Sequence, residues 1–412
     1  MASRLKLSNE NATSILRAHD GEFGELVRLE KWDNLNTSVK IYTAIYSQTS
    51  TSSSNHNKKA IITIASTAQS LDTIEALHKT IRTHTSIPLP ALLKRDVTTS
   101  LIAHPYSLYS HPSGVSLTDL YPKSSPLSVD TKPHSDRDPD KALFLLKTEL
   151  KLGSLTKILH ESVQNDWFGL PGEDAENKKE WGECYSWQEG FTILLENALE
   201  EAEGLLKKAS SKVPGLESEG VAGADNDHGI PTQDIHRLLS RAIGSFLFDD
   251  VEVPSLIFHP CPSVSGWLSR IFVSDKITNP TANTEEPEIA GLLGWESCIW
   301  GDPLLEGCFA SSINGNHTNQ EREGEGEGRK LEWPSKAFLK GYGSTPIVLP
   351  RHRTKRLWYD LYVTLKALVV FLIEDSDGDA ENDNGGRKNG VVKEKVEGIK
   401  EVVRKLENAP CY

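Results

Sequence analysis

The sequence predicts an α+β protein of two lobes, a small antiparallel-sheet lobe over residues 1–120 and a mainly helical lobe over residues 121–412. Short β-branched segments gather before residue 110, whereas segments with the period of an amphipathic helix prevail after residue 140. The length of 412 residues suits one two-lobed protein with insertions. Stretches rich in Gly, Ser and charged residues predict flexible, solvent-exposed insertions at about 208–232, 313–330 and 375–392.

The small lobe begins with two predicted strands, residues 39–46 (VKIYTAIY) and 59–66 (KAIITIAS), which a Ser-rich connection joins. Residues 71–83 follow, with apolar side chains at 71, 74, 77 and 81, the spacing of one face of a helix. The prolines of SIPLP at 86–90 end that helix, because proline cannot continue it. Residues 101–109 are predicted as a further strand, which completes a small sheet with one helix.

The large lobe is predicted to be mostly helical, with helices over 140–152, 186–208, 235–247, 336–341 and 353–374. Ser186 is followed three residues later by Glu189, the pattern of a capping box at a helix start. Short β segments are predicted at 256–257 and, as a pair, at 269–273 and 288–293.

Charge and cysteine usage exclude several classes of protein. The 45 Lys and Arg residues stand against 58 Asp and Glu, and the net charge of −13 argues against nucleic-acid binding. The five cysteines show no CxxC spacing, which predicts reduced thiols in a cytoplasmic protein. The longest apolar run, 361–373, is too short to span a membrane and contains Lys366, so no membrane partner is expected.

An ordered set of motifs runs from about Leu35 to Tyr362. The set comprises SIPLP (86–90), PSGVSLTDLY (112–121), VPSLIFHP (253–260), IFVSD (271–275), EIAGLLGWESCIWGDPLLE (288–306), FLKGYG (338–343) and RLWYDLYVTLKAL (356–368). In this order it resembles the aminoglycoside phosphotransferase-like kinases, and especially a fungal-type branch of them. The resemblance implies a two-lobed protein-kinase-like fold. In that family, ATP and Mg²⁺ support phosphate transfer to a small molecule, by positioning and charge neutralisation.

The resemblance also implies a set of charged positions, and this chain departs from them. Thr63 stands where a strand Lys or Arg would hold the phosphates, and Glu75 stands where a helix Glu would pair with that cation. His259 matches the family histidine, but Cys261 replaces the aspartate that positions the attacking hydroxyl. Without its cation partner, Glu75 is interpreted as an ordinary exposed helix glutamate.

Both metal positions differ as well. Arg270, or Ser269 with another gap placement, stands where an asparagine would bind Mg²⁺, and a guanidinium repels a metal ion. Gly294 replaces the metal aspartate, although Trp295 and Glu296 match the rest of that motif. The loop over 32–38, which would cover the nucleotide, contains no glycine. Four residues are expected to support or line the cleft: Trp267, Trp295, Glu296 and Asp302.

The combined losses predict a pseudokinase that binds a small metabolite or a protein partner, without ATP or magnesium. One alternative is an active ATP- and Mg-dependent small-molecule kinase with an unusual metal set of Glu296, Asp302 or Asp275. Another is a structural interaction protein. His259 and Cys261 also suggest a thiol nucleophile, against which stands a simple packed cysteine. The basic cluster Arg351, Arg353, Lys355 and Arg356 is interpreted as a solvated patch, with an acidic partner as the alternative.

Overall fold

The computed structural model describes residues 5–19, 23–48, 57–121, 139–172, 184–210, 229–274, 287–310, 333–376 and 385–411. They fall into two compact units. The first comprises Met1–Val163, Ser265–Cys298 and Gly324–Ser344, and the second comprises Gln164–Val264, Ile299–Glu323 and Thr345–Tyr412. An antiparallel sheet near the N-terminus and a mostly helical remainder confirm the predicted α+β class. The predicted lobe boundary near residue 120 stays a prediction. The insertion predicted at 313–330 and most of that at 208–232 lie outside the described residues.

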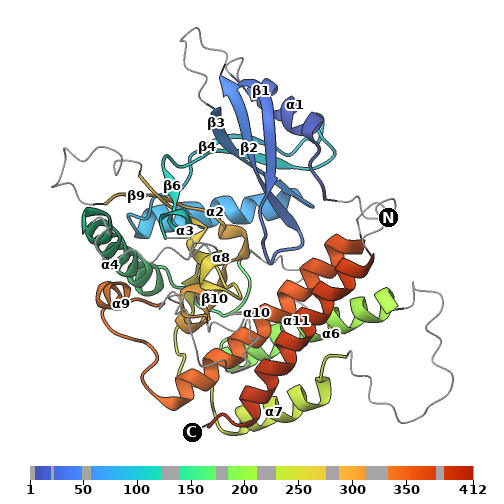
Figure 1. The fold of residues 1–412 in the computed structure, drawn as a ribbon, viewed down its shortest axis with the longest axis vertical. Helices are drawn as coiled ribbons and strands as arrows, with labels where there is room; N and C mark the ends of the chain where they lie inside the picture. The colour runs from blue at the N-terminus through green and yellow to red at the C-terminus, as the bar shows by residue number, and fades with distance from the viewer. Residues whose placement is uncertain are drawn as a thin grey trace, which may run out of the picture. The chain divides into compact units, whose positions relative to one another are not determined.

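The first unit contains a five-stranded antiparallel sheet in the order β1-β2-β3-β5-β4 (Figure 1). Its strands are β1 (Phe23–Lys31), β2 (Val39–Gln48), β3 (Asn57–Ala65), β4 (Leu92–Asp96) and β5 (Tyr106–Ser110). The strands predicted at 39–46 and 59–66 are confirmed as β2 and β3. The strand predicted at 101–109 begins only at residue 106, and β1 and β4 were not predicted.

The two faces of this sheet bury different sets of side chains, because successive residues of a strand point to opposite faces. One face packs on α1 (Asn9–His19), where Tyr42 and Ile62 meet Ile15 in a common core. The other, which we call the inner face, packs Ile41 and Ile61 against residues that follow much later in the chain.

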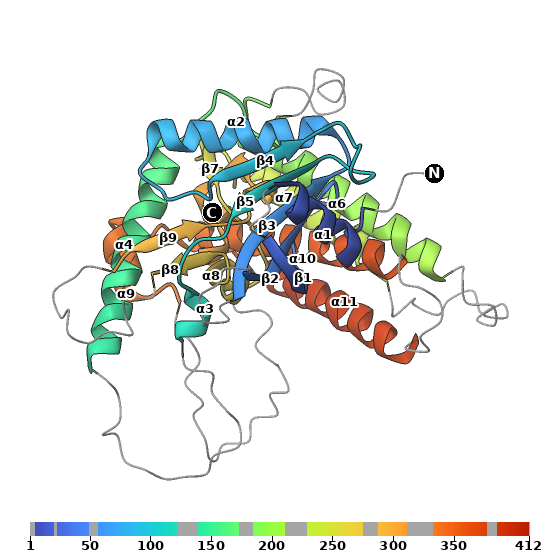
Figure 2. The same cartoon turned by 90° about the horizontal axis from the view of Figure 1, so that it is seen from above.

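Helix α2 (Ala68–His84) confirms the helix predicted at 71–83. The side chain of Thr67 caps its start by accepting a hydrogen bond from the Ser70 amide. Figure 2 shows α2 alongside β4.

A second, three-stranded sheet in the first unit has the order β6-β8-β9. It joins β6 (Val115–Ser116), β8 (Ile271–Val273) and β9 (Ile289–Leu292), which confirms the β pair predicted at 269–273 and 288–293. Gly114 lets the chain turn into β6, since its φ is 103° and a Cβ there would meet the Val273 carbonyl oxygen at 1.9 Å. The remaining helices of this unit are α3 (Leu117–Leu120), α4 (Pro139–Ser162) and α9 (Lys336–Tyr342), and α8 (Val264–Leu268) leads into β8.

The second unit is built mainly from α6 (Trp187–Ser210), α7 (Thr232–Gly244), α10 (Pro350–Ser376) and α11 (Gly385–Glu407) (Figure 1). Helix α10 packs on both α6 and α11, and α11 packs on α7. A two-stranded ladder pairs β7 (Ser255–Ile257) with β10 (Ile299–Gly301), and two short 3₁₀ turns follow, η3 (Pro303–Leu305) and η4 (Gly307–Phe309). Among the described residues, no helix is long and apolar enough to cross a membrane.

Helix α11 was not predicted, and the insertion assigned to 375–392 is wrong from residue 385 onward. The segment opens with Gly-Gly-Arg-Lys-Asn-Gly, a composition typical of loops. The apolar residues that follow recur at helical spacing and are buried: Val396, Ile399, Val402, Val403 and Leu406. Burial of this stripe in the second unit outweighs the poor helix propensity of the first turn.

Candidate functional site

The β1–β2 loop, residues 32–38, lies against the short 3₁₀ turn η2 (Trp295–Ser297) of the first unit. The side-chain amide of Asn36 donates a 2.7 Å hydrogen bond to the Glu296 carbonyl oxygen. The side-chain amide of Asn34 donates to the Val39 carbonyl oxygen at 3.0 Å, which ties the loop to the start of β2. Two asparagine side chains therefore hold the loop, one to the start of β2 and one to η2, and the loop contains no glycine.

Trp32, at the start of this loop, covers part of the inner face of the sheet. Its indole N–H donates to Thr43 Oγ1 on β2 at 2.7 Å. Its ring stacks on Phe272 of β8, with centroids 6.2 Å apart and planes inclined by 27°. The Arg270 guanidinium carbon lies 4.5 Å from a Trp32 ring centroid, which is a cation–π contact. Trp32, Arg270 and Phe272 thus form one cluster, which we call the Trp32 cluster.

Gly294 adjoins the Trp32 cluster through Arg270. Arg270 is 3% exposed, and its carbonyl oxygen accepts a 2.9 Å hydrogen bond from the Leu293 amide. Gly294 has φ 106° and ψ 27°, a left-handed conformation that glycine adopts easily. A Cβ added to Gly294 would lie 3.4 Å from Arg270 Cδ. The structure therefore brings together the nucleotide-loop position and both metal positions predicted from the sequence, Arg270 and Gly294.

Glu296 brings a carboxyl group to the same region. Burial raises the pKa of this carboxyl, and the charge of Arg270 opposes the shift. Its Oε1 atom is buried and has no hydrogen-bond partner among the described residues. The neighbouring Trp295 is buried, with its indole N–H donating to the Leu292 carbonyl oxygen at 2.9 Å and its ring edge-on to His78. The arrangement offers a partly buried carboxyl beside a guanidinium rather than a pair of metal ligands.

Thr63 and Glu75 do not form the cation-and-carboxylate pair of an active kinase. Thr63 is buried in β3, between Ile41 of β2 and Ser107 of β5. Glu75 instead accepts a 2.8 Å hydrogen bond from Arg95 of the edge strand β4.

Arg95 binds a second carboxylate as well. It also donates to Asp72, one helical turn before Glu75. Burial acts to lower the pKa of Arg95, but the hydrogen bonds to Asp72 and Glu75 outweigh it and raise this pKa above its ordinary value. Helix α2 is therefore held to β4 by an ion pair that sequence reasoning missed.

His259 and Cys261 belong to the second unit, where backbone hydrogen bonds fix the segment. The amides of Phe258 and His259 donate to the two carboxylate oxygens of the fully buried Glu306, at 2.7 and 2.9 Å. The Cys261 thiol is buried and donates to the Ser263 carbonyl oxygen at 3.1 Å. A nucleophilic thiol needs an exposed, electropositive setting, so this geometry favours the packed cysteine.

Asp302 has a bonding role in the second unit. Its Oδ1 accepts a hydrogen bond from the Leu304 amide at 2.9 Å and so caps η3. Its Oδ2 accepts from the Tyr359 hydroxyl at 2.7 Å and lies 3.1 Å from Lys355 Nζ. Burial and the Asp302 charge raise the pKa of Tyr359 well above its ordinary value. Protein groups therefore engage both oxygens of Asp302.

The basic cluster on α10 is not the solvated patch that we predicted. Lys355 and Arg356 are each 2% exposed, and only Arg353 of the four is exposed. Lys355 pairs with Asp250 as well as with Asp302, and Arg356 pairs with Asp360 at 2.7 Å. Carboxylates of the same unit neutralise these cations, which is why they can be buried.

Trp267 lies in an aromatic cluster of the first unit. Its ring is 6.2 Å from that of Trp333 and 6.0 Å from that of Phe338 at the start of α9, and it is almost fully buried. The tryptophan that contacts Arg270 is Trp32, which sequence reasoning had noted only as part of a loop without glycine. Its position, directly after β1 and within the nucleotide-loop segment, was the available signal.

No group of three or more His, Cys, Asp and Glu side chains that could hold a metal ion occurs within the part of the chain that the structure describes. Asp275, one member of the alternative metal set, lies outside the described residues.

Comparison with known proteins gave matches among solved structures only. No protein-family model and no curated protein matches the chain. One similar structure is a putative aminoglycoside phosphotransferase from Ralstonia eutropha JMP134, with a TM-score of 0.46 and 12% identity over 97% of this chain and 99% of that one.

Two further matches are of the same kind. A thermostable mutant of aminoglycoside phosphotransferase APH(4)-Ia, complexed with ADP and hygromycin B, has a TM-score of 0.44 and 13% identity over 95% of this chain and 98% of that one. The GDP and kanamycin complex of APH(2")-IIIa has a TM-score of 0.46 and 10% identity over 96% and 98%. All three TM-scores lie below 0.5, so these likenesses assign no role to any residue of this chain.

We expect the free energy of unfolding to depend on pH through His78 on α2. It is 5% exposed, and burial, followed by the charge of Arg82, lowers its pKa to about 4. The unfolded chain therefore binds a proton between pH 6.5 and 4 that the folded chain does not, so stability falls as pH decreases through this range. Between pH 7 and 5 this group should remove about 2 kcal/mol from the free energy of unfolding. Urea unfolding at both pH values should show a smaller loss for His78→Phe, and an equal loss in the variant would contradict the assignment.

Proposed function

We propose that this chain is a pseudokinase of the aminoglycoside phosphotransferase-like family, which transfers no phosphate and acts by binding a small metabolite or a protein partner. The Trp32 cluster supports this most strongly. Its side chains fill the inner face of the sheet beside the loop that would cover a nucleotide. A cytoplasmic location and the absence of nucleic-acid and membrane partners belong to the same proposal, on the basis of charge and cysteine usage.

Charge complementarity argues against nucleotide binding at this place. A triphosphate with its metal needs a cation on the strand and oxygen ligands for Mg²⁺. Thr63 supplies no charge, and Gly294 supplies no side-chain ligand. Arg270 carries a charge of the wrong sign for a metal, and it is buried against Trp32. The nucleotide would have to displace the indole and would then lack its counter-ions.

The alternative of an active small-molecule kinase needs a new metal set. Asp302 fits it poorly, because both of its oxygens are engaged by Leu304, Tyr359 and Lys355. Glu296 fits it better through its unbonded Oε1, but it lies beside the positive charge of Arg270. The remaining observations thus favour a protein that binds without catalysis.

A phosphate-transfer assay tests the proposal. The unmodified protein is incubated with labelled ATP, Mg²⁺ and a pool of hydroxylated and amino metabolites, and the expected result is no labelled product. Labelled product would overturn the proposal if Glu296→Gln abolishes it and Glu200→Gln, a variant at an exposed helix position, retains it. The chain would then have an active site built from other residues.

A further inference from the structure

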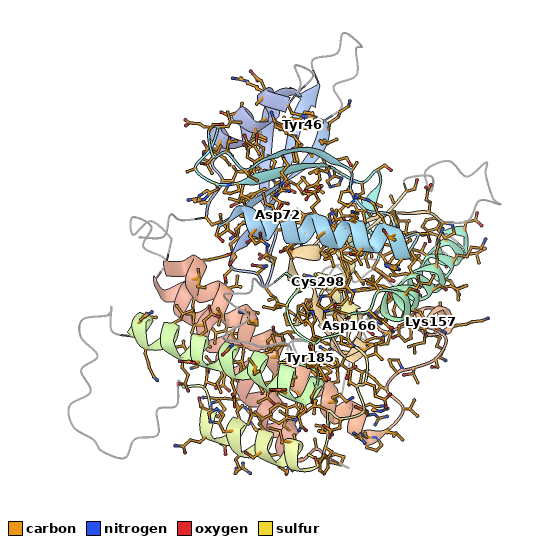
Figure 3. The ribbon with its side chains drawn as sticks, turned by 180° about the vertical axis from the view of Figure 1, so that it is seen from behind. Tyr46, Asp72, Lys157, Asp166, Tyr185 and Cys298 are labelled. Carbon is orange, nitrogen blue, oxygen red and sulfur yellow. The ribbon has the colours of Figure 1, made fainter. Side chains whose placement is uncertain are left out.

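Two adjoining pockets lie along α2 in the first unit. One of about 460 Å³ is bordered by α2, β4 and β5, and the other of about 570 Å³ by α2 and β4. They share Glu75 and Arg82, so we treat them together as the α2 pocket. Its size is in the range of small-molecule sites. Figure 3 marks Asp72, which lines the second pocket, on α2.

One end of the α2 pocket presents apolar and aromatic side chains beside the charged Glu75 and Arg82. Leu89, Leu92 and Tyr109 line it together with His78. His78 is 95% buried, and its Nε2 atom has no hydrogen-bond partner among the described residues. Burial lowers its pKa to about 4, so the ring is neutral near pH 7 and can offer one hydrogen bond to a bound molecule. A buried polar atom without a partner is unfavourable unless something else satisfies it.

The other end keeps an excess of positive charge, although the whole chain is acidic. Arg95 there binds both Asp72 and Glu75, so one cation already serves the two carboxylates of the lining. Lys79 and Arg82 have no ion-pair partner within the part of the chain that the structure describes. The Arg82 guanidinium donates a hydrogen bond to the Pro90 carbonyl oxygen at 2.9 Å. Two cations one turn apart on a helix face the same side and can share one anion.

We propose that the α2 pocket binds a small organic anion, a molecule with an apolar or aromatic body and one carboxylate or phosphate group. Arg82 and Lys79 would pair with the anionic group, because an arginine fork suits planar or tetrahedral oxyanions. Leu89, Leu92 and Tyr109 would cover the body. The proposal goes beyond the pseudokinase assignment and is independent of it, since no residue of the Trp32 cluster lines this pocket.

Titration calorimetry and thermal shift with four probes test the proposal. Phenyl phosphate and benzoate carry both an aromatic body and an anionic group, benzyl alcohol lacks the charge, and inorganic phosphate lacks the body. We expect the two aromatic anions to bind and to raise Tm, with the neutral alcohol and inorganic phosphate at least about tenfold weaker, because each lacks one of the two contacts. The better of phenyl phosphate and benzoate identifies the anionic group.

Variants locate the site. Arg82→Gln and Lys79→Gln should each weaken the better aromatic anion by about tenfold, and His78→Leu should weaken it as well. Arg17→Gln, the same charge change at an exposed position of α1, should leave binding within about twofold. All substituted cations are exposed, so the glutamine variants should fold, and circular dichroism checks this.

Three results would overturn the proposal: no binding of either aromatic anion, equal binding of all four probes, or unchanged binding by Arg82→Gln and Lys79→Gln. Nucleotide titration is a separate arm. ATP binding that survives Arg82→Gln would count against the pseudokinase assignment and leave the α2 pocket standing.

Discussion

Replacing Arg356 by methionine should lower the free energy of unfolding by about 3–5 kcal/mol, the cost of breaking a buried ion pair from one side. Arg356 donates two hydrogen bonds to Asp360, at 3.0 and 2.7 Å, and two more to the carbonyl oxygens of Leu304 and Glu306. Arg356 and Asp360 are 2% and 1% exposed. Methionine fills a similar volume but leaves the Asp360 carboxylate without its cation in a dry environment.

The neighbouring Arg353 gives a matched control. It lies three residues earlier in α10 and is exposed, so Arg353→Gln should change stability by no more than about 0.5 kcal/mol. Arg356→Met combined with Asp360→Leu should regain part of the loss, because it removes both charges. Urea unfolding measures all three variants. A loss below about 1 kcal/mol for Arg356→Met would mean that the pair is not buried as described.

Introducing a strand cation and a possible metal ligand together, with Thr63→Lys and Gly294→Asp, should not produce phosphate transfer. An aspartate at 294 would begin 3.4 Å from the Arg270 side chain and would pair with its guanidinium instead of a metal ion. A lysine at 63 would find Glu75 already bound to Arg95. Cys261 would still occupy the position where the resemblance implies a group that positions the hydroxyl, and such a group typically contributes on the order of 10²–10⁴-fold.

Labelled-ATP assays compare this double variant with a quadruple variant that also carries Cys261→Asp and Arg270→Asn. We expect no product from the double variant, because the repairs act as a unit and are strongly non-additive. Any phosphate transfer should appear first in the quadruple variant, because it removes the positive charge of Arg270, which repels a metal ion. Transfer by the double variant near the ~1 s⁻¹ of ordinary kinases would show that Arg270 and Cys261 do not block the reaction.

The sequence allowed the sheet and helix that carry the site to be predicted, because their patterns are local. β2, β3 and α2 follow from β-branched runs and from apolar spacing within single segments. β1 and β4 lack such runs: charged residues interrupt FGELVRLEK without a regular period, and LLKRD ends in three consecutive charged residues. Helix α11 is a different case. The helical spacing of its apolar residues is visible in the sequence, but its glycine-rich start suggested a loop.

The sequence singled out positions in the candidate site but not the contacts that these positions make. Thr63 and Gly294 could be identified from motifs that surround them. The Asn36 contact with Glu296 joins residues 260 positions apart, and no local pattern encodes such a pair. The pairing of Arg95 with Glu75 likewise depends on the edge strand β4 lying beside α2. For Arg356, a signal did exist, since Asp360 stands four residues later on the same helix.

The thermal response of the unmodified protein to Mg-ATP tests the pseudokinase proposal without any substitution. A nucleotide present at roughly 100 times its Kd would stabilise the folded protein by about 2.7 kcal/mol, and a thermal-shift series resolves such a change easily. Because Trp32 and Arg270 fill the inner face of the sheet, we expect no change in Tm with ATP or GTP, with or without divalent metal. A rise of several degrees with Mg-ATP that EDTA abolishes would contradict it.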